Sequence, residues 1–230
     1  MVSAQLPLDL QLHSGHRLDT FYSGVNGAAF YGVNAVLSGV DAQCFIAGAG
    51  GSGKTHLLEG SVHYAQQQGL YACLVPAKEI RQLPPEALDD MEQFDLLAID
   101  DADELVGHAE WEEALFHLYN RLMARDGRLL VAGPCPPAQL GIALPDLATR
   151  WAAGPVYQLQ APSEEQLASL LYFRMQQLGL HLEQGVSDYI LLRSKRTINE
   201  LVGIIERLDS AAMVEKRALT VPFVKMVMGW

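Results

Sequence analysis

The sequence is short of basic residues. Sixteen lysines and arginines stand against 27 aspartates and glutamates, so the 230 residues carry a net charge of −11. Proteins that bind nucleic acid through a broad basic surface gain most of their affinity by neutralising phosphates. The acidic balance therefore argues against a protein of that kind, although it leaves room for a local basic patch.

Cysteine is scarce as well. The three cysteines, Cys44, Cys73 and Cys135, form no CxxC pair and no metal-ligand spacing. Two of them fall in expected core strands, where buried reduced thiols are usual for a cytosolic protein. The sequence therefore predicts free thiols and a cytoplasmic location.

Long apolar runs are missing too. No stretch is long enough to span a membrane, so no membrane association is expected. The N-terminus has no basic region, and Pro7 and Asp9 interrupt its apolar residues, which is unlike a secretory signal. Half of the residues are hydrophobic, which predicts a globular chain with one large domain, or one domain and a small appendage.

What the sequence does contain is a complete phosphate-loop motif, G-x-x-x-x-G-K-T, at residues 48–55. A short apolar stretch before it predicts a buried strand, and apolar positions at helical spacing follow it. A loop placed in this way directs backbone N–H groups at phosphate oxygens. The residues predicted to bind a nucleotide are Gly48, Ala49, Gly50, Gly51, Ser52, Gly53, Lys54, Thr55 and His56.

Particular roles follow from the motif. Lys54 is expected to reach the β- and γ-phosphates, and Thr55 to place its hydroxyl on Mg²⁺. The alternative is a glycine-rich turn that binds nothing.

A second motif lies downstream, where the apolar stretch 96–99 ends in Asp100 and Asp101. After a phosphate loop this is a Walker B pattern, in which Asp100 is predicted to hold the metal and Asp101 to orient an attacking water. For Asp101 the alternative is the cap of a helix or turn.

Strands and helices alternate up to about residue 160, and only helices are expected beyond it. Strands are predicted over residues 43–47, 71–75, 95–100, 128–133 and 155–160. Helices are predicted over residues 26–38, 54–68, 109–125, 164–178, 183–194, 197–215 and 221–228. This order predicts a doubly wound parallel α/β sheet with helices on both faces and its ligand at the carboxyl ends of the strands. A small all-helical lid follows, and Ser163 is predicted to cap its first helix.

The helix over 109–125 has a distinct apolar face. Trp111, Leu115, Leu118 and Leu122 share that face and are predicted to lie in the core. Glutamates 110, 112 and 113 stand near its start, where negative charge complements the helix dipole.

The phosphate loop, the acidic strand end and the helical lid together resemble the AAA+ class, and within it the DnaA subgroup. Residues 144–150, Leu-Pro-Asp-Leu-Ala-Thr-Arg, match the segment that ends in an arginine finger in that subgroup. The resemblance implies that Arg150 acts in trans on the γ-phosphate of an ATP bound by a neighbour. The alternative is a surface arginine in an ordinary ion pair.

Within the subgroup the sequence resembles the Hda family, whose members inactivate DnaA. The resemblance runs from about residue 5 to the C-terminus and includes Leu-Tyr-Asn-Arg at 118–121 after Trp-Glu at 111–112. The lid is the last expected element, whereas DnaA carries a further DNA-binding domain. The resemblance implies bound ADP or ATP with Mg²⁺, and a place in the bacterial cytoplasm near the replisome.

The N-terminus carries another part of this resemblance. Gln5, Leu6, Pro7, Leu8, Asp9 and Leu10 resemble the clamp-binding peptide of the Hda family. Such an extended peptide docks apolar side chains in a groove while one polar residue fixes its register. Leu6, Leu8 and Leu10 are the predicted anchors. From spacing alone, an edge strand or packing on the chain's own domain is an equally good reading.

The predicted division of the whole chain is a tail over 1–16, a core over 17–161 and a lid over 162–230.

Two positions depart from the AAA+ pattern. Pro134 and Cys135 follow the strand where a polar side chain is expected to contact the γ-phosphate, and neither is a good donor. Asn199 stands where the class commonly has an arginine that reaches the phosphates. Arg196, three residues earlier and expected on the same helical face, is the predicted substitute, unless it is simply solvated. These departures argue against fast autonomous hydrolysis and leave nucleotide binding intact.

The resulting hypothesis is a regulator of replication initiation. The tail tethers the chain to the DNA-loaded β sliding clamp of DNA polymerase III, so DNA is reached indirectly and the local concentration rises. Arg150 then stimulates ATP hydrolysis by DnaA, which inactivates DnaA and prevents re-initiation. The alternative is an autonomous AAA+ ATPase of the helicase-loader type. A metabolite kinase fits the lid and the Arg150 segment less well, and a homodimer remains open.

Overall fold

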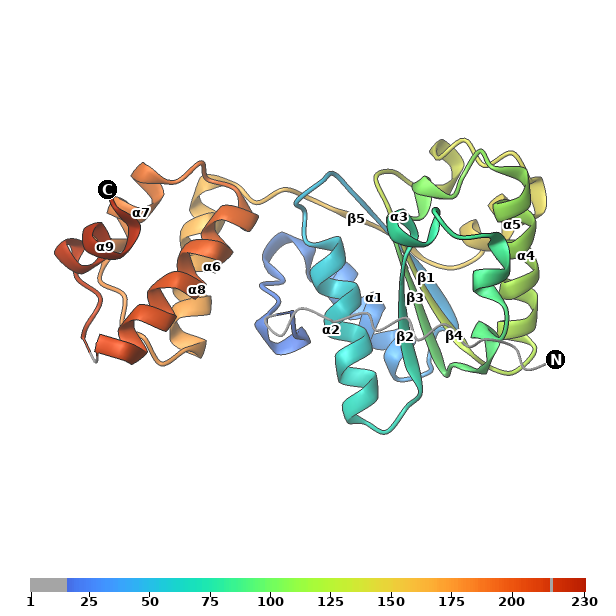
Figure 1. Ribbon diagram of the computed structural model, residues 1–230, viewed down its shortest axis with the longest axis horizontal. Coiled ribbons are helices and arrows are strands. Elements are labelled where there is room, and N and C mark those ends of the chain that lie inside the picture. The colour runs from blue at the N-terminus through green and yellow to red at the C-terminus, as the bar shows by residue number, and fades with distance from the viewer. Residues whose placement is uncertain (1–15, 216) are drawn as a thin grey trace.

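The computed structural model describes residues 16–215 and 217–230. A parallel sheet has helices on both faces, and the C-terminal helices stand beside it (Figure 1). The predicted clamp-binding residues 5–10 lie outside the described residues. None of the helices described is long and apolar enough to cross a membrane.

Five parallel strands form the sheet in the order β2-β3-β4-β1-β5. The strands are β1 (Gln43–Gly48), β2 (Ala72–Pro76), β3 (Leu96–Asp100), β4 (Arg128–Gly133) and β5 (Val156–Leu159). Nearly every residue of the three inner strands β1, β3 and β4 is buried, as expected for a parallel sheet covered on both faces. The predicted fold class is confirmed, and the predicted strands differ from the observed ones only at their ends.

The helices form a layer on each side of the sheet. Helices α1 (Gly27–Leu37) and α2 (Lys54–Gln67) cover one face, while α4 (Ala109–Met123) and α5 (Pro145–Ala152) cover the other (Figure 1). The remaining core elements are α3 (Ala77–Ile80) and the 3-10 turns η1 (Leu18–Thr20), η2 (Gly24–Asn26), η3 (Pro85–Leu88), η4 (Met91–Gln93), η5 (Ala102–Glu104) and η6 (Pro137–Gln139).

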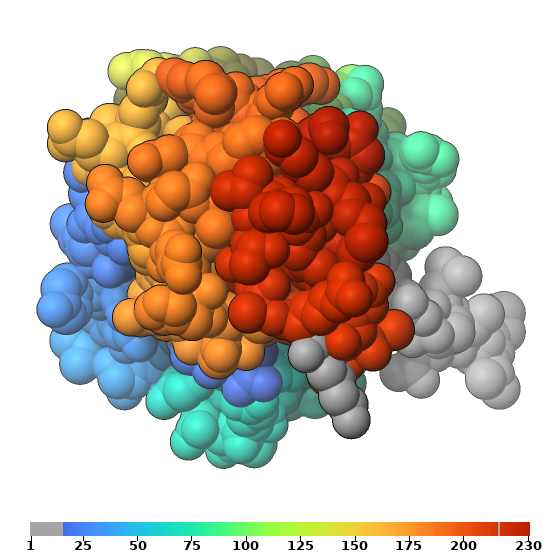
Figure 2. Space-filling model, turned by 90° about the vertical axis from the view of Figure 1, so that its left-hand side faces the viewer, coloured from blue at the N-terminus to red at the C-terminus, as the bar shows by residue number. Residues whose placement is uncertain are grey.

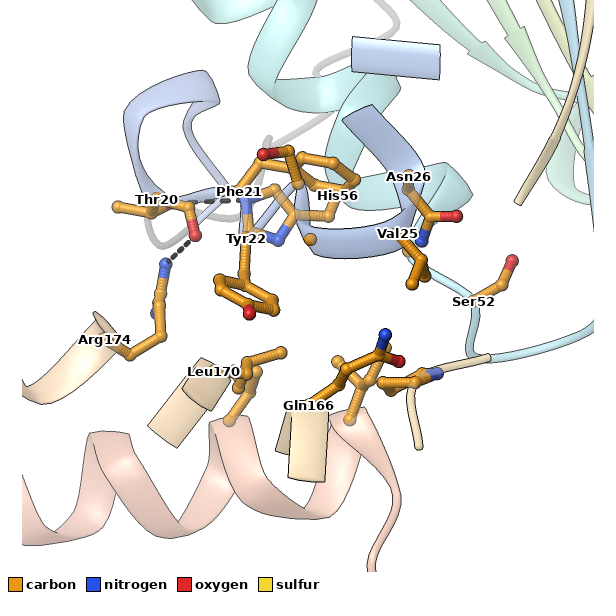
Figure 3. Close-up of a pocket in the computed structure, with 16 residues that line it drawn as sticks. Thr20, Phe21, Tyr22, Val25, Asn26, Ser52, His56, Gln166, Leu170 and Arg174 are labelled. Carbon is orange, nitrogen blue, oxygen red and sulfur yellow. Dashed lines mark hydrogen bonds between the residues drawn. The ribbon is translucent and has the colours of Figure 1, made fainter. Parts of the chain in front are cut away.

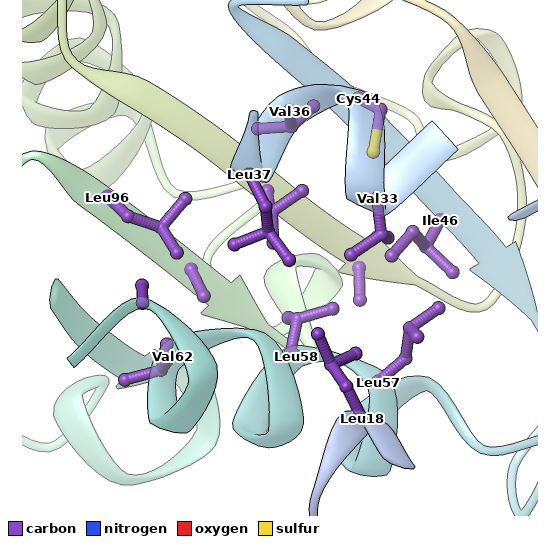
Figure 4. Packing of buried hydrophobic residues seen from close by; sticks show 14 of the residues in the cluster. Leu18, Val33, Val36, Leu37, Cys44, Ile46, Leu57, Leu58, Val62 and Leu96 are labelled. Atoms are coloured by element: carbon purple, nitrogen blue, oxygen red, sulfur yellow. The ribbon is translucent and has the colours of Figure 1, made fainter. Parts of the chain in front are cut away.

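Each layer has its own apolar core. In the first, Val33 of α1, Ile46 of β1 and Leu57 of α2 meet, and Leu18 joins them from η1 (Figure 4). In the second, the predicted core face of α4, which includes Trp111, is buried against the sheet. Leu18 therefore fixes the segment before α1 on the surface of α2.

The lid consists of α6 (Glu164–Gln177), α7 (Gln184–Arg193), α8 (Ile198–Glu215) and α9 (Val221–Met228), which bury a separate apolar cluster. These helices occupy most of the face seen in Figure 2. The predicted cap is confirmed, because Ser163 and Gln166 exchange side-chain-to-backbone hydrogen bonds in a capping box. The division proposed after residue 161 falls between β5 and α6.

The segment between residues 16 and 26 joins the lid to the core. Arg174 of α6 donates a 3.0 Å hydrogen bond to the carbonyl of Thr20, and Gln177 donates to the carbonyl of Asp19. The ring of Tyr22 lies 5.6 Å from that of Phe173. The same segment therefore contacts α2 on one side and α6 on the other.

Gly60 of α2 lets this segment lie close to the helix, because a Cβ there would be 2.9 Å from the backbone of Arg17 and Leu18. We expect Gly60→Ala to destabilise the protein by about 1–3 kcal/mol through overpacking, despite its better helix propensity. Gly203→Ala in α8 is the matched control, since its Cβ would meet no atom within 4 Å. It is expected to stabilise the protein by up to about 1 kcal/mol. Denaturant unfolding of both variants measures the difference, and equal shifts would contradict the close approach.

Candidate nucleotide site

The phosphate loop connects β1 to α2 and is shaped by its glycines. Gly51 and Gly53 have φ angles of 73° and 100°, in the left-handed region that glycine adopts readily. A Cβ at Gly48 would lie 2.6 Å from Oγ of Ser52, so the loop closes tightly on itself. Gly53 is the N-cap of α2, and no described side chain caps the helix there. The first N–H groups of α2 are therefore available to an anion.

Lys54 points back into the loop. The residue is only 7% exposed, and its ammonium donates to the carbonyl oxygens of Gly48 at 2.7 Å and Ala49 at 3.1 Å. These acceptors are neutral, so they orient the ammonium without cancelling its charge. The lysine is thus held in place for a phosphate.

Thr55 and Asp100 meet beside the loop. Oγ1 of Thr55 donates a 2.6 Å hydrogen bond to Oδ2 of Asp100, at the end of β3. Oδ1 of Asp100 is buried and has no hydrogen-bond partner among the described residues. Burial raises the pKa of this carboxyl, and the hydrogen bond from Thr55 opposes the rise. An unpaired carboxylate oxygen beside a hydroxyl fits a hard cation such as Mg²⁺.

The described residues contain no group of three or more His, Cys, Asp or Glu suited to a metal. A cation held by Asp100 and Thr55 would therefore complete its shell with phosphate oxygens and water, as Mg²⁺ prefers.

Asp101 has a φ of 49°, a left-handed conformation that is uncommon outside glycine. It stands at the N-cap position of η5, yet its side chain makes no capping hydrogen bond. The side chain is therefore not committed to a cap, and its predicted role toward water stays a prediction.

A pocket opens beside the loop, between the core and the lid. Its walls come from the segment before α1, from the loop and α2, and from α6 and α8 (Figure 3). The lining residues include Phe21, Tyr22, Val25, Asn26, Ser52, His56, Gln166, Leu170, Arg174, Ile198 and Val202. An aromatic and apolar pocket with a few polar groups, next to a phosphate loop, suits a nucleoside.

Most of these lining residues were not predicted from the sequence, because they lie on four segments that only the folded chain brings together. His56 was predicted, and it forms part of the wall. Its Nε2 lies 2.9 Å from the carbonyl oxygen of Arg17, and its ring stacks on His16 at 4.7 Å. Burial lowers the pKa of His56 to about 4, so its imidazole is neutral at pH 7.

The lid brings Asn199 to the loop. A Cβ on Gly51 would lie 4.0 Å from the amide nitrogen of Asn199, so this side chain stands over the phosphate loop. An amide is a hydrogen-bond donor but carries no charge. At the end of β4, Pro134 and Cys135 offer no stronger donor.

The expectation that Arg196 shares a helical face with Asn199 is wrong. Helix α8 begins at Ile198, and Arg196 precedes it with a φ of 57°. Its guanidinium pairs with Glu164 and donates to the carbonyl of Leu191 at 3.2 Å. The hydroxyl of Thr197 accepts from the N–H of Glu200, which is the Thr-x-x-Glu signal of a helix start. Because the helix begins after Thr197, the three-residue spacing between Arg196 and Asn199 does not place these two residues on one helical face.

Arg150 lies elsewhere, in the last turn of α5, on the sheet face opposite α2 (Figure 1). Its side chain is exposed, and its guanidinium carbon lies 5.8 Å from the centre of the Tyr119 ring. No ion pair involves Arg150 among the described residues. The geometry gives this arginine an aromatic support and leaves its charge open to solvent.

Comparison with known proteins agrees with this arrangement. Residues 12–158 match the family described as the bacterial DnaA ATPase domain, and residues 164–228 match the lid domain of Hda. The chain belongs to the Hda/DnaA-like AAA+ family. It is a DnaA-related replication regulator, and the resemblance predicted from its motifs is confirmed.

Solved structures with the same AAA+ fold extend beyond DnaA. Domain III of DnaA from Thermotoga maritima superposes with a TM-score of 0.76 at 21% identity, over 95% of this chain and 98% of that one. AMPPCP-bound DnaA from Aquifex aeolicus gives 0.73 at 25% identity, over 89% and 68%. RuvB from Thermotoga maritima, a Holliday junction branch migration motor, gives 0.64 at 16% identity, over 91% and 69%.

Proposed function

We propose that this Hda/DnaA-like protein binds ADP or ATP as a structural switch and stimulates ATP hydrolysis by DnaA through Arg150. Hydrolysis inactivates DnaA and prevents re-initiation of replication. The observation that carries the proposal is the placement of Arg150. The arginine is exposed at the end of the matching α5 segment, on the sheet face opposite the chain's own α2.

The chain's own site supports nucleotide binding. Residues 48–55 would hold the phosphates, with Lys54 neutralising their charge, while the pocket against Tyr22 and Leu170 would receive the nucleoside. Thr55 and Asp100 would hold Mg²⁺, which supplies charge neutralisation on the β- and γ-phosphates. Because this pocket has walls from core and lid, a bound nucleotide would stabilise their arrangement.

Two features of the same site argue that this chain hydrolyses its own ATP slowly. The neutral amide of Asn199 stands over the loop, and Arg196 is engaged by Glu164. A transferring phosphoryl group spreads charge over its oxygens and needs cationic partners. We propose that the partner's site supplies the chemistry while Arg150 supplies one cation in trans.

The test is ATP hydrolysis by DnaA with and without this chain, in the presence of DNA-loaded clamp. Stimulation that requires Arg150 is the expected result. Hydrolysis by DnaA that does not respond to the chain would contradict the proposal.

The clamp is reached through the tail. We expect Leu6→Ala/Leu8→Ala to weaken binding to the β clamp by about tenfold or more, because two apolar anchors leave the groove. Surface plasmon resonance on immobilised clamp measures the change. Ser3→Ala, a truncation outside residues 5–10, is the control and is expected to bind normally. Equal affinity of both variants would contradict the tether.

An autonomous ATPase of the helicase-loader type remains the second candidate. Two observations favour it. Thr55 contacts Asp100, and the side chain of Asp101 makes no capping hydrogen bond. All three groups would serve hydrolysis of the chain's own ATP. Steady-state turnover by the isolated chain separates the two candidates, because a motor turns over rapidly without DnaA.

A further inference from the structure

A buried carboxylate connects the loop that follows η5 to the loop that precedes α5. Glu112, in the first turn of α4, is 1% exposed, whereas Glu110 and Glu113 beside it are exposed. Its Oε1 accepts hydrogen bonds from the N–H groups of Gly107 at 2.7 Å and Ala143 at 3.1 Å. Its Oε2 accepts from the N–H of Leu144 at 2.6 Å. One side chain thus fixes two loops.

One of these loops follows the Walker B residues, and the other leads into α5, the helix that carries Arg150. Gly107 follows η5, just after the Walker B residues, while Leu144 is the N-cap of α5. Among the described residues, Glu112 is the side chain that accepts hydrogen bonds from the N–H groups of Ala143 and Leu144, just before α5. The direction in which α5 leaves its loop therefore depends on Glu112.

The other end of α5 is held as well. Nε2 of Gln43 donates a 2.7 Å hydrogen bond to the carbonyl of Arg150, and Trp151 packs 6.1 Å from the ring of Phe45. Between these anchors the guanidinium of Arg150 lies over Tyr119. An eight-residue helix has little stability of its own, so its orientation comes from such anchors.

We propose that Glu112, together with Tyr119, positions Arg150 for its action in trans. The proposal rests on the function proposed above for Arg150. Glu112 fixes the start of α5 through hydrogen bonds from backbone N–H groups. Tyr119 supports the guanidinium of Arg150 near the C-terminal end of α5. Neither residue touches the partner's phosphate; both act through the placement of Arg150.

Glu112→Gln tests the first contact with little change in shape. Its amide group would face either the two donors at Oε1 or the single donor at Oε2, so at least one N–H meets another donor. We expect clamp-dependent hydrolysis by DnaA to fall by up to about 100-fold, the loss that a misplacement of roughly 1 Å can cause. The maximal rate falls, while the half-saturating concentration of the chain and its affinity for ADP stay unchanged.

Glu113→Gln is the matched control, since it removes the same charge from the exposed neighbouring position. It is expected to stimulate DnaA normally. If Glu112→Gln stimulates as well as this control while Arg150→Ala is inactive, the positioning proposal is overturned and the proposed function stands. If Arg150→Ala remains active, both are overturned.

A double variant separates positioning from general damage. In an Arg150→Lys background, which keeps part of the rate, Glu112→Gln is expected to cause a smaller fold loss than in the wild type, because its effect passes through the guanidinium at position 150. An equal fold loss in both backgrounds would overturn the proposal. Should Glu112→Gln fail to fold, Tyr119 decides: Tyr119→Phe keeps the ring and full stimulation, while Tyr119→Leu lowers the maximal rate. Equal rates for these two would also overturn it.

Discussion

Arg150→Ala is expected to abolish the stimulation of DnaA hydrolysis, lowering the clamp-dependent rate by about 10³-fold or more. The physical reason is that the guanidinium would no longer stabilise charge on the transferring phosphoryl group of the partner. Arg150→Lys should recover only part of the rate, because an ammonium lacks the planar fork that contacts two oxygens. Single-turnover hydrolysis of DnaA-bound ATP with loaded clamp measures these rates.

The controls for this variant follow from where Arg150 lies. It is on the sheet face opposite α2, so ADP binding by the variant is expected to be normal. Arg125→Ala, which removes another exposed arginine just beyond α4, should stimulate DnaA fully. Full stimulation by Arg150→Ala would contradict the assignment of the finger.

Lys54→Ala is expected to weaken binding of ADP and ATP by about 100-fold or more, in line with losses on truncating one partner of a buried charge pair. The loss arises because the buried ammonium, oriented by the carbonyls of Gly48 and Ala49, is the cation that the phosphate-loop motif assigns to the phosphates. Isothermal titration calorimetry measures the affinity directly. The thermal stabilisation that excess ADP gives the wild type should largely disappear.

Lys78→Ala provides the comparison for this variant, because Lys78 is exposed on α3. Its affinity for ADP should equal that of the wild type. Normal binding by Lys54→Ala would show that the loop does not hold phosphate.

Much of the fold could be predicted from the sequence, because local pattern and burial agree there. The apolar strands lie within a residue or two of their predicted places, and Trp111 packs in the core as its helical spacing indicated. The phosphate loop could be recognised because its glycines and its strand–helix context carry local information. Asp100 could be placed beside Thr55 for the same reason.

Other parts depended on contacts between distant segments. Glu112 looked like an acid that complements a helix dipole, and nothing local distinguishes it from Glu113; only the loops at 107 and 143–144 bury it. The nucleoside pocket forms only where four segments meet: the one before α1, the phosphate loop with the start of α2, α6 and α8. The error at Arg196 was different, since the capping signal of Thr197 was present in the sequence and outweighs helical spacing.

The segment from His16 to Asn26 has a consequence for the geometry of tethering. It packs on α2, accepts hydrogen bonds from α6 and forms a wall of the nucleoside pocket. In the sequence, residues 11–15 separate the predicted clamp-binding residues 5–10 from His16, the first residue of this segment. A ligand that stiffens the pocket would therefore also fix the point on the core from which the proposed tether starts.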